Sequence, residues 1–505
     1  MRRAGSFFLV FIFLFCLPAM PVIASDPKSE VEELKNEVEK LLKRIEDLER
    51  RQVESEVKTQ ETEKKVEGIE KVTTKIEQED AKLKEEKKTR AITYWRDGFN
   101  IETPDGRFRL QLAGVLHFDT RVFESGRSTG GFDIRRGRYD MRGYHYRGDT
   151  EHVFRLQIEM ADGPYLRNAY WMFKFRPELN LQLGQFKIPS GGADWLTEEA
   201  QVNFIEYATA TPVSPFFDRG INIHSFFLEG KVQTCLGMFT GAGIDADMHK
   251  GDQDTHRDYV LRLLLIPFKD SENTYLKGMH FAGSYQHGYQ SIKTRRGETG
   301  NRTENYESRW FNWVQDYVDL SNRQRYGGEF HWIIGSTALS YEFNRVEWED
   351  LTVYDRAGGT VNAIYPDRYH ADVHQVWISY FLTGEEKQFQ DVFFSWRQPK
   401  PQKNFSLKEG TWGAWEVLAR YAYHDTSKDL FEGPGSLLQG SNKGYSLTAG
   451  LRWIWNPKVR IMLDANYLKS TDGDGIIVER AEKGGTARSF KESETALLMR
   501  LILTP

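Results

Sequence analysis

Hydrophobic and polar residues alternate one by one along most of the chain after residue 107. Phe108, Leu110 and Leu112 are separated by single polar residues, and the same period recurs at residues 154–160 and 461–467. Because successive side chains of a strand point to opposite faces, this period predicts strands with one apolar and one polar face. Roughly 16 or 17 such segments follow one another, and since a one-chain bacterial barrel has an even number of strands, we predict about 16.

The predicted connections differ in length. The short turns lie at residues 177–180, 229–231, 334–336, 383–385 and 456–458, and the long polar stretches at residues 242–255, 291–322, 349–369, 399–410, 427–443 and 471–488. A soluble sandwich also uses alternating strands, but short turns at one end and long loops at the other are typical of an outer-membrane barrel. The pattern therefore favours a transmembrane antiparallel β-barrel.

The first 90 residues have a different pattern. Residues 1–24 combine Arg2 and Arg3, an apolar run over 7–17 and a small residue at Ala24, which predicts a secretory signal peptide. A single anchoring helix is the alternative, but the apolar run is shorter than the roughly 20 residues that a span needs.

Residues 25–90 are rich in Glu, Lys, Arg and Gln, with apolar residues at alternate steps of three and four. This spacing includes Val31, Leu34, Val38, Leu41 and Ile45, is polar in the middle, and resumes after residue 65. A heptad of this kind predicts an α-helical coiled coil, with a solvated single helix or disorder as the alternative. The seam residues do not decide how many helices associate.

Composition excludes several classes of function. Acidic residues outnumber basic ones, 73 to 68, so nothing indicates a nucleic-acid partner. Removal of the signal peptide leaves Cys235 as the only cysteine, which excludes a disulfide within the chain. The 12 histidines are scattered, and no Ser/His/Asp or metal-ligand spacing stands out. We therefore expect no enzyme activity, no cofactor and no metal site.

Several segments of the body match a known family. They are residues 98–114 (GFNIETPDGRFRLQLAG), 132–138 (FDIRRGR), 169–186, 241–243, 380–385 (YFLTGE), 413–421 and 456–460 (NPKVR). In their order and spacing, the chain resembles the phosphate-selective porins O and P over residues 98–503. The resemblance implies a homotrimer of 16-stranded barrels in the outer membrane of a diderm bacterium, surrounded by outer-membrane lipid.

The resemblance also implies a long loop that follows the fifth strand and folds into the lumen. Here it corresponds to about residues 188–218, which include apolar Trp195, Leu196 and Phe204. In the family, basic residues that line the pore pass anions from one weak site to the next. The in-folded loop of this chain is acidic instead, which puts phosphate selectivity in doubt. Its acidic residues are Asp194, Glu198, Glu199 and Glu206.

The paired arginines of the family correspond to Arg135 and Arg136. Alternation predicts that these neighbours face opposite sides, with Arg136 in the lumen, because arginine facing lipid at the bilayer midplane costs about 2 to 4 kcal/mol. The candidate anion contacts are Arg109, Arg135, Arg136, Arg138, Arg142, Lys174, Lys187 and Arg219, and the same test adds Arg155, Arg420, Arg452 and Arg460 as lumen candidates.

These observations divide the chain into a signal peptide (1–24), a coiled coil (25–90) and an outer-membrane porin β-barrel (91–505). The predicted fold is an all-β transmembrane antiparallel barrel of about 16 strands preceded by an α-helical coiled coil. The predicted function is passive diffusion of small solutes, anions such as phosphate among them. One alternative is a tether or adhesin that works through the coil and contacts the periplasm or cell wall. The other is a barrel enzyme.

Overall fold

The computed structural model describes residues 27–124, 131–161, 163–208, 217–241, 243, 256–289, 301–305, 307–315, 318–320, 322–355, 359–390, 395–433, 435–482 and 485–505. The predicted signal peptide lies outside these residues. The chain divides into two compact units, residues 1–88 and 89–505.

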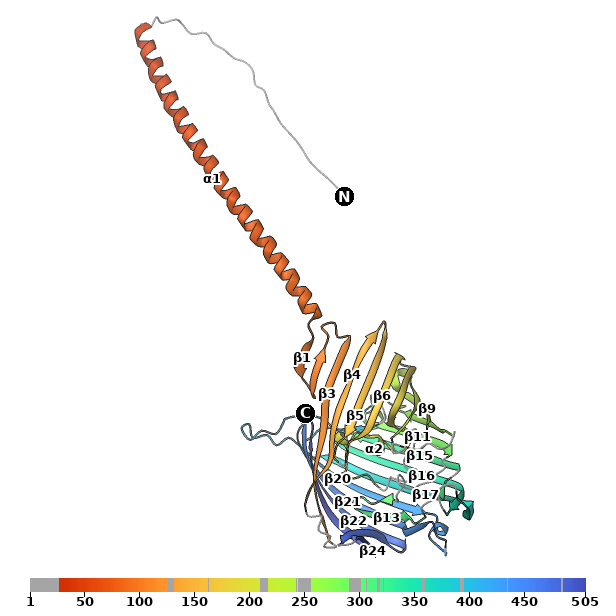
Figure 1. Ribbon diagram of the computed structural model, residues 1–505. Helices are drawn as coiled ribbons and strands as arrows, with labels where there is room; N and C mark the ends of the chain where they lie inside the picture. Colours follow the sequence, from red (N-terminus) through yellow and green to blue (C-terminus); the bar gives the residue numbers. More distant parts are fainter. Residues whose placement is uncertain are drawn as a thin grey trace. The chain divides into compact units, whose positions relative to one another are not determined.

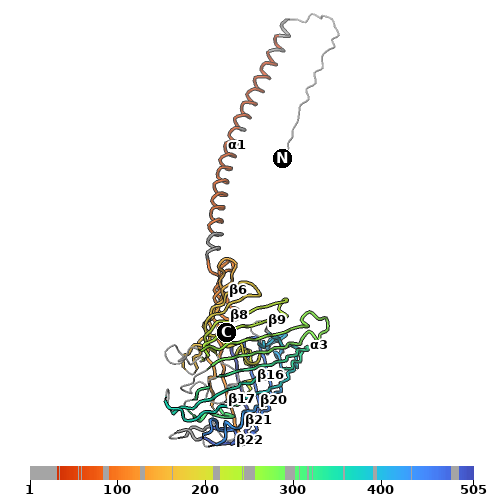
Figure 2. The backbone as a smooth tube through the Cα atoms, turned by 90° about the vertical axis from the view of Figure 1, so that its right-hand side faces the viewer, coloured from red at the N-terminus to blue at the C-terminus, as the bar shows by residue number. Residues whose placement is uncertain are grey.

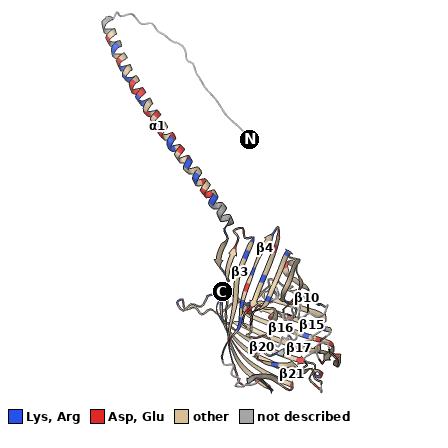
Figure 3. Cartoon of the chain, viewed as in Figure 1, with Lys and Arg blue, Asp and Glu red and all other residues tan. Residues whose placement is uncertain are grey.

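The first unit contains one long helix, α1 (Pro27–Thr89). Basic and acidic residues alternate in bands along it (Figure 3). Its apolar side chains are exposed, among them Val38, Leu41, Ile45 and Leu48. The helix is therefore present where the heptad predicts it, while its association into a coiled coil stays a prediction. No helix among the described residues is both long and apolar enough to cross a membrane.

The second unit is a closed antiparallel barrel of 16 strands, as the alternation predicted (Figure 1). Each strand pairs with the next, and the last, β25, pairs with the first, β3, from Leu503 opposite Leu116 to Ala496 opposite Phe123. The barrel strands are β3 (Phe108–Phe123), β4 (Phe132–Arg147), β5 (Thr150–Glu159), β6 (Tyr165–Arg176), β7 (Leu179–Lys187), β8 (Phe217–Phe227), β9 (Val232–Phe239), β10 (Asp258–Leu265), β11 (Met279–Tyr289), β15 (Asn322–Ile334), β16 (Thr337–Tyr354), β17 (Val361–Phe381), β20 (Ala414–Thr426), β21 (Leu438–Asn456), β22 (Val459–Gly473) and β25 (Ser493–Leu503). Figure 2 shows β16, β17, β20, β21 and β22 side by side, in agreement with their pairing.

Burial follows the predicted two-residue period. In β25, Leu497 and Met499 are exposed on the outer face, whereas Leu498 and Arg500, which alternate with them, are buried. An outward row of apolar side chains suits contact with lipid, and an inward row of charged and polar ones fills the lumen. The chemistry of the lumen therefore resides in the inward half of each strand.

Smaller elements complete the described residues. They are β1 (Ile92–Trp95), β2 (Phe99–Glu102), α2 (Ala193–Leu196), η1 (Glu199–Gln201), η2 (Leu228–Gly230), α3 (Thr274–Lys277), β12 (Asn301–Arg302), β13 (Ser308–Trp313), β14 (Val318–Asp319), β18 (Gln388–Gln390), β19 (Ser395–Arg397), η3 (Lys428–Leu430), β23 (Ile476–Glu482) and β24 (Gly485–Lys491). β2 continues the wall beyond the end of β25, because it pairs with the first half of β3.

The connections confirm the predicted asymmetry only in part. The prediction of a long loop at residues 349–369 was wrong, because β16 extends to Tyr354 and β17 begins at Val361, and at the end with the short turns 13 residues, 266–278, join β10 to β11. Two-residue turns join β6 to β7, β15 to β16 and β21 to β22. At the same end of the barrel, however, residues 382–413 join β17 to β20 and include the hairpin of β18 and β19. Two predictions were wrong here: residues 383–385 are not a complete turn between barrel strands, and residues 399–410 are not a loop at the opposite end. Both belong to this one long connection.

Candidate functional site

The connection between β7 and β8 lies against the inner face of the barrel. Inward-facing arginines from five strands donate hydrogen bonds to its backbone carbonyl groups. These bonds join Arg262 of β10 to Gly191 (2.6 Å), Arg460 of β22 to Ala200 (3.0 Å), Arg452 of β21 to Asn203 (2.7 Å), Arg420 of β20 to Glu206 (3.0 Å) and Arg500 of β25 to Ile205. We call residues 188–208 the lumen loop. Residues 209–216 of the predicted constriction loop lie outside the described residues.

The second half of the lumen loop places acidic side chains on wall arginines. Glu206 contacts Arg121 (2.9 Å), Arg135 (3.3 Å) and Arg500 (2.8 Å), and all four side chains are buried. One carboxylate therefore meets guanidinium groups from β3, β4 and β25 together.

The two neighbouring glutamates pair in the same way. Glu199 contacts Arg138 of β4 and Arg167 of β6, the latter at 3.0 Å. Glu198 contacts Arg155 of β5 at 2.6 Å. Three of the four predicted acidic residues, Glu198, Glu199 and Glu206, lie in this half of the loop, and each is paired with at least one arginine.

These contacts explain the acidity of the loop carboxyls. Burial alone would raise the pKa of Glu198, but the Arg155 guanidinium outweighs it and lowers the pKa to about 2. Burial likewise opposes ionisation of Glu199 and Glu206, yet the surrounding arginines hold the pKa of both carboxyls well below the usual range. All three are therefore carboxylates at neutral pH.

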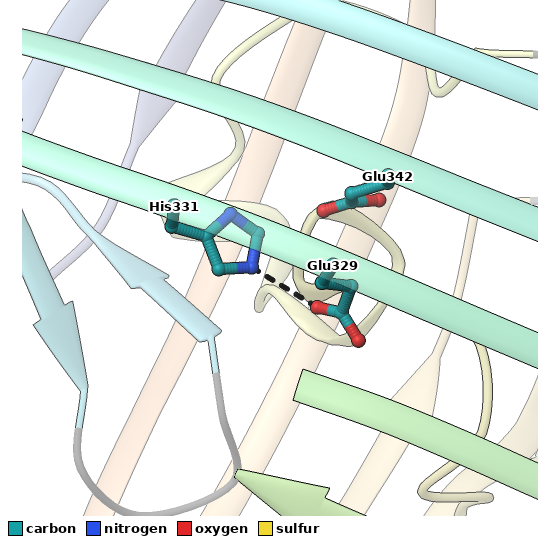
Figure 4. A group of neighbouring side chains, drawn as sticks. All are labelled: Glu329, His331 and Glu342. Atoms are coloured by element: carbon teal, nitrogen blue, oxygen red, sulfur yellow. Dashed lines mark hydrogen bonds and ion pairs between the residues drawn. The ribbon is translucent and has the colours of Figure 1, made fainter. Parts of the chain in front are cut away.

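The first half of the lumen loop is held by the opposite chemistry. The backbone N–H groups of Ala193 and Asp194, at the start of α2, donate to the carboxylates of Glu329 and Glu342, both at 2.8 Å. Glu329, His331 and Glu342 form one buried group on β15 and β16 (Figure 4). Here the wall supplies the acids and the loop supplies neutral donors.

The Asp194 side chain is also fixed within this half. Its carboxylate accepts hydrogen bonds from Asn203 (2.9 Å), Trp377 (2.8 Å) and Gln375 (3.2 Å). All three donors are neutral. Asp194 therefore belongs to the anchor of the loop.

A second segment, from the long connection 382–413, packs against the lumen loop. Trp396 is fully buried beside Trp377, with ring centroids 4.8 Å apart, and its backbone N–H donates to Thr197 (2.9 Å). Gln398 donates from its backbone to the Gln201 side chain (2.9 Å). The lumen is thus occupied by segments that enter from both ends of the barrel.

Arg135 and Arg136 do not face opposite sides, so that prediction was wrong. The register of β4 against β3 shifts between Arg136 and Ile134. A bulge of this kind inserts one residue and interrupts the alternation. Both arginines are buried, and Arg135 reaches Glu206 of the lumen loop.

Arg219 is a second correction. In β8, alternation places it on the face of Ile221 and Ile223, whose side chains are exposed on the outside of the barrel. It donates to Gln185 on the neighbouring strand (3.3 Å). The prediction that Arg219 lines the pore was wrong, because the residue was assigned from its position beside the loop rather than from the register of the strand.

The other predicted basic residues lie on the inward side and have local partners. Arg109 donates to Asn100 (2.9 Å), Arg142 to Gln111 (2.8 Å), Lys174 to Glu151 (3.0 Å), and Lys187 to the carbonyl groups of Trp195 (2.6 Å) and Thr197 (3.3 Å). Lys187 also lines a cavity of about 610 Å³, partly open to solvent, together with Arg155, Glu198 and Asn222.

Three other inward arginines are more deeply buried than these residues. Arg136, Arg420 and Arg460 are at most 9% exposed, and none forms an ion pair with a carboxylate of the described residues. Arg420 and Arg460 donate only to neutral acceptors, the carbonyl groups of Glu206 and Ala200 among them. Buried guanidinium groups without counterions make the surrounding lumen electropositive.

A closed 16-stranded antiparallel barrel with charged segments in its lumen defines the class of outer-membrane channel proteins. The sequence profile of the phosphate-selective porin O and P family matches residues 110–475, which confirms the resemblance. The chain belongs to this family. The chain is therefore an outer-membrane channel protein.

Solved structures with a similar fold include outer-membrane proteins of three bacteria. OmpT of Vibrio cholerae is 11% identical (TM-score 0.46; 79% of this chain and 99% of that chain covered). An anion-selective porin from Comamonas acidovorans is 12% identical (0.46; 79% and 100%), and the channel DcaP of Acinetobacter baumannii is 8% identical (0.44; 80% and 99%). No curated protein sequence matches the chain.

Proposed function

We propose that this porin passes small solutes with a preference for anions, phosphate among them. The observation that carries the proposal is the group of three buried arginines, Arg136, Arg420 and Arg460, that have no carboxylate partner among the described residues. A fixed positive charge in a narrow, partly dehydrated passage attracts anions more strongly than the same charge in bulk water.

The acidic lumen loop does not oppose this preference. Glu199 and Glu206 are each neutralised by two or three guanidinium groups, so their charge is not available to a passing cation. Glu198 is the most exposed of the three, and it too is paired, with Arg155. These ion pairs support the proposed anion preference despite the acidic sequence of the loop.

The reversal potential of the purified full-length protein in a planar bilayer tests the proposal. In a low-salt potassium chloride gradient we expect a potential of the sign that marks chloride as the more permeant ion, and added phosphate should reduce the chloride current. Arg136→Met should shift the potential toward zero. Arg107→Met serves as the matched control, because Arg107 is exposed and bonds only locally, to Gly148 and Asp105.

Cation preference of the wild-type channel would overturn the proposal. An Arg136→Met shift no larger than that of Arg107→Met would show that Arg136 does not act on the passage. Both shifts should shrink at molar salt, where screening extends over only about 3 Å.

We also propose that the protein is a homotrimer that α1 supports by self-association. The apolar seam of α1 is exposed, with Leu41 57% and Leu48 59% accessible, and burial of such a seam against other helices would stabilise an oligomer. Light scattering in detergent should give three chains per particle. Deletion of residues 25–90 should lower the temperature at which the trimer dissociates, and a deletion that leaves this temperature unchanged would remove the role of α1.

A further inference from the structure

A compact group of potential metal ligands lies on the inner wall of the barrel. The arginines that pair with Glu199 and Glu206 lie on other strands, β3, β4, β6 and β25. Glu329 and His331 are on β15, and Glu342 is on β16 (Figure 4). One ligand atom from each of the three residues lies within 4.8 Å of the others. All three residues are buried, with Glu329 6%, His331 0% and Glu342 1% exposed.

The register of β15 against β16 places two carboxylates next to each other, and their repulsion costs free energy. Glu329 lies directly opposite Glu342, and like charges in this position destabilise a sheet. Glu329 pairs with Arg262 (2.7 Å). Glu342 and nearby Asp194 accept hydrogen bonds only from neutral donors and form no ion pair within the described part of the chain. Buried carboxylates without a cation carry a large desolvation cost.

A second observation concerns Gln375 of β17, whose side chain is 6% exposed and aimed into the group. Its amide nitrogen donates to Glu342 (2.8 Å) and to Asp194 (3.2 Å), while its amide oxygen has no hydrogen-bond partner. Because the oxygen and nitrogen of an amide exchange places by a flip of the side chain, this oxygen is an additional acceptor available to a cation.

The histidine is already oriented as a metal ligand would be. Nδ1 of His331 lies 2.9 Å from the Ser340 hydroxyl, and this contact directs Nε2 toward Glu329, at 3.1 Å. An outer partner on the second ring nitrogen fixes the orientation of metal-binding histidines.

We propose that Glu329, His331 and Glu342 bind one divalent transition-metal ion. One imidazole nitrogen with two carboxylates suits Zn²⁺ or Mn²⁺, whereas Mg²⁺ and Ca²⁺ favour sites made of oxygen alone. The ion offsets the two facing glutamates and, because both accept hydrogen bonds from α2, it ties the first half of the lumen loop to β15 and β16. This inference does not depend on the ion preference of the channel.

Zinc binding to the full-length protein in detergent tests the proposal. After the protein is stripped with a chelator, titration calorimetry with ZnCl₂ should show one ion per chain, and the bound zinc should raise the thermal unfolding midpoint. His331→Gln and Glu342→Gln should each weaken binding at least about tenfold, since the loss of an outer partner alone has an effect of that size. MgCl₂ should not compete.

Asp464→Asn is the matched control. Asp464 is also a buried wall carboxylate that accepts a backbone N–H of the lumen loop, from Ile205 at 2.7 Å, but its charge is paired with Arg452 and it has no histidine beside it. This variant should keep the zinc affinity of the wild type. Absence of zinc binding by the wild type, unchanged affinity in His331→Gln, or equal competition by Mg²⁺ would each overturn the proposal. The reversal potential is measured separately, so failure of this inference leaves the proposed anion preference standing.

Discussion

The two halves of the lumen loop are fixed to the barrel by opposite chemistry. Near residue 193 the loop offers neutral N–H groups to wall carboxylates, whereas from residue 198 to residue 206 it offers carboxylates to wall arginines. Where it contacts the loop, the inner wall therefore presents carboxylates at β15 and β16 and guanidinium groups at β3 to β6 and β25. The charge that a solute meets depends on this pairing and cannot be read from the acidic residues of the loop alone.

The largest effect is expected where one loop carboxylate serves three arginines. Glu206→Gln removes a buried carboxylate that contacts Arg121, Arg135 and Arg500. Arg121 and Arg500 keep their contact with Asp119, so we expect a loss near the lower end of the about 3 to 5 kcal/mol that removal of one partner from a buried ion pair costs. The midpoint of denaturant unfolding in detergent should fall accordingly. Glu492→Gln is the control, because its pair with Lys469 is at the surface, where such pairs contribute roughly 0 to 1 kcal/mol.

A second comparison separates paired from unpaired arginines on one strand. Arg138→Met removes the ion pair of Glu159, while Glu199 keeps its contact with Arg167, so it should cost up to about 3 kcal/mol. Arg136→Met removes a buried guanidinium that has no counterion in the part of the chain that the structure describes, so it should leave stability unchanged or raise it. Equal losses of stability in the two variants would contradict the assignment of Arg136 as unpaired.

The stability of the protein should depend on pH through the loop carboxyls that pair with wall arginines. The pKa of Glu198 is lowered from 4.5 to about 2, and the arginines around Glu199 and Glu206 also hold the pKa of both carboxyls well below the usual range. A carboxyl with a depressed pKa contributes stability that is present above its unfolded value and lost as the pH falls through its folded value. The thermal midpoint should thus decline below about pH 4.5. Glu206→Gln should show a shallower decline, and an identical slope would argue against its role.

Much of the fold could be predicted from the sequence because a strand repeats every two residues. The alternation in residues 107–112 and 461–467 identified barrel strands, and the predicted number of strands was confirmed. The connection 382–413 was missed because Gly384 gives the sequence of a tight turn, while the segment that follows is held by tertiary contacts. Trp396 and Trp377, far apart in the sequence, meet only inside the closed barrel.

Less of the site than of the fold could be predicted from the alternation of apolar and polar residues. Alternation identified Arg138 and Arg155 as inward, but it failed at Arg135, where a bulge adds a residue. Arg219 was assigned from its position beside the loop, although the alternation of β8 places it on the outer face. Pattern alone also could not show that Glu206 meets Arg500, because 294 residues separate them in the chain. Long-range pairing of this kind follows from barrel closure and not from local spacing.

The smallest loss of stability is expected for Glu198, the most exposed of the three loop carboxylates that pair with wall arginines. Its side chain is 45% exposed, and its partner Arg155 also contacts Asp140 at 2.7 Å, so Glu198→Gln does not leave that arginine without a counterion. Stability should fall by at most about 1 kcal/mol, as for a partly exposed pair. Because the residue lines the cavity with Lys187, loss of its negative charge should still raise the permeability of chloride relative to potassium. A larger loss of stability than in Glu206→Gln would mean that the ranking of the two anchors is wrong, and an unchanged reversal potential would place the passage away from this cavity.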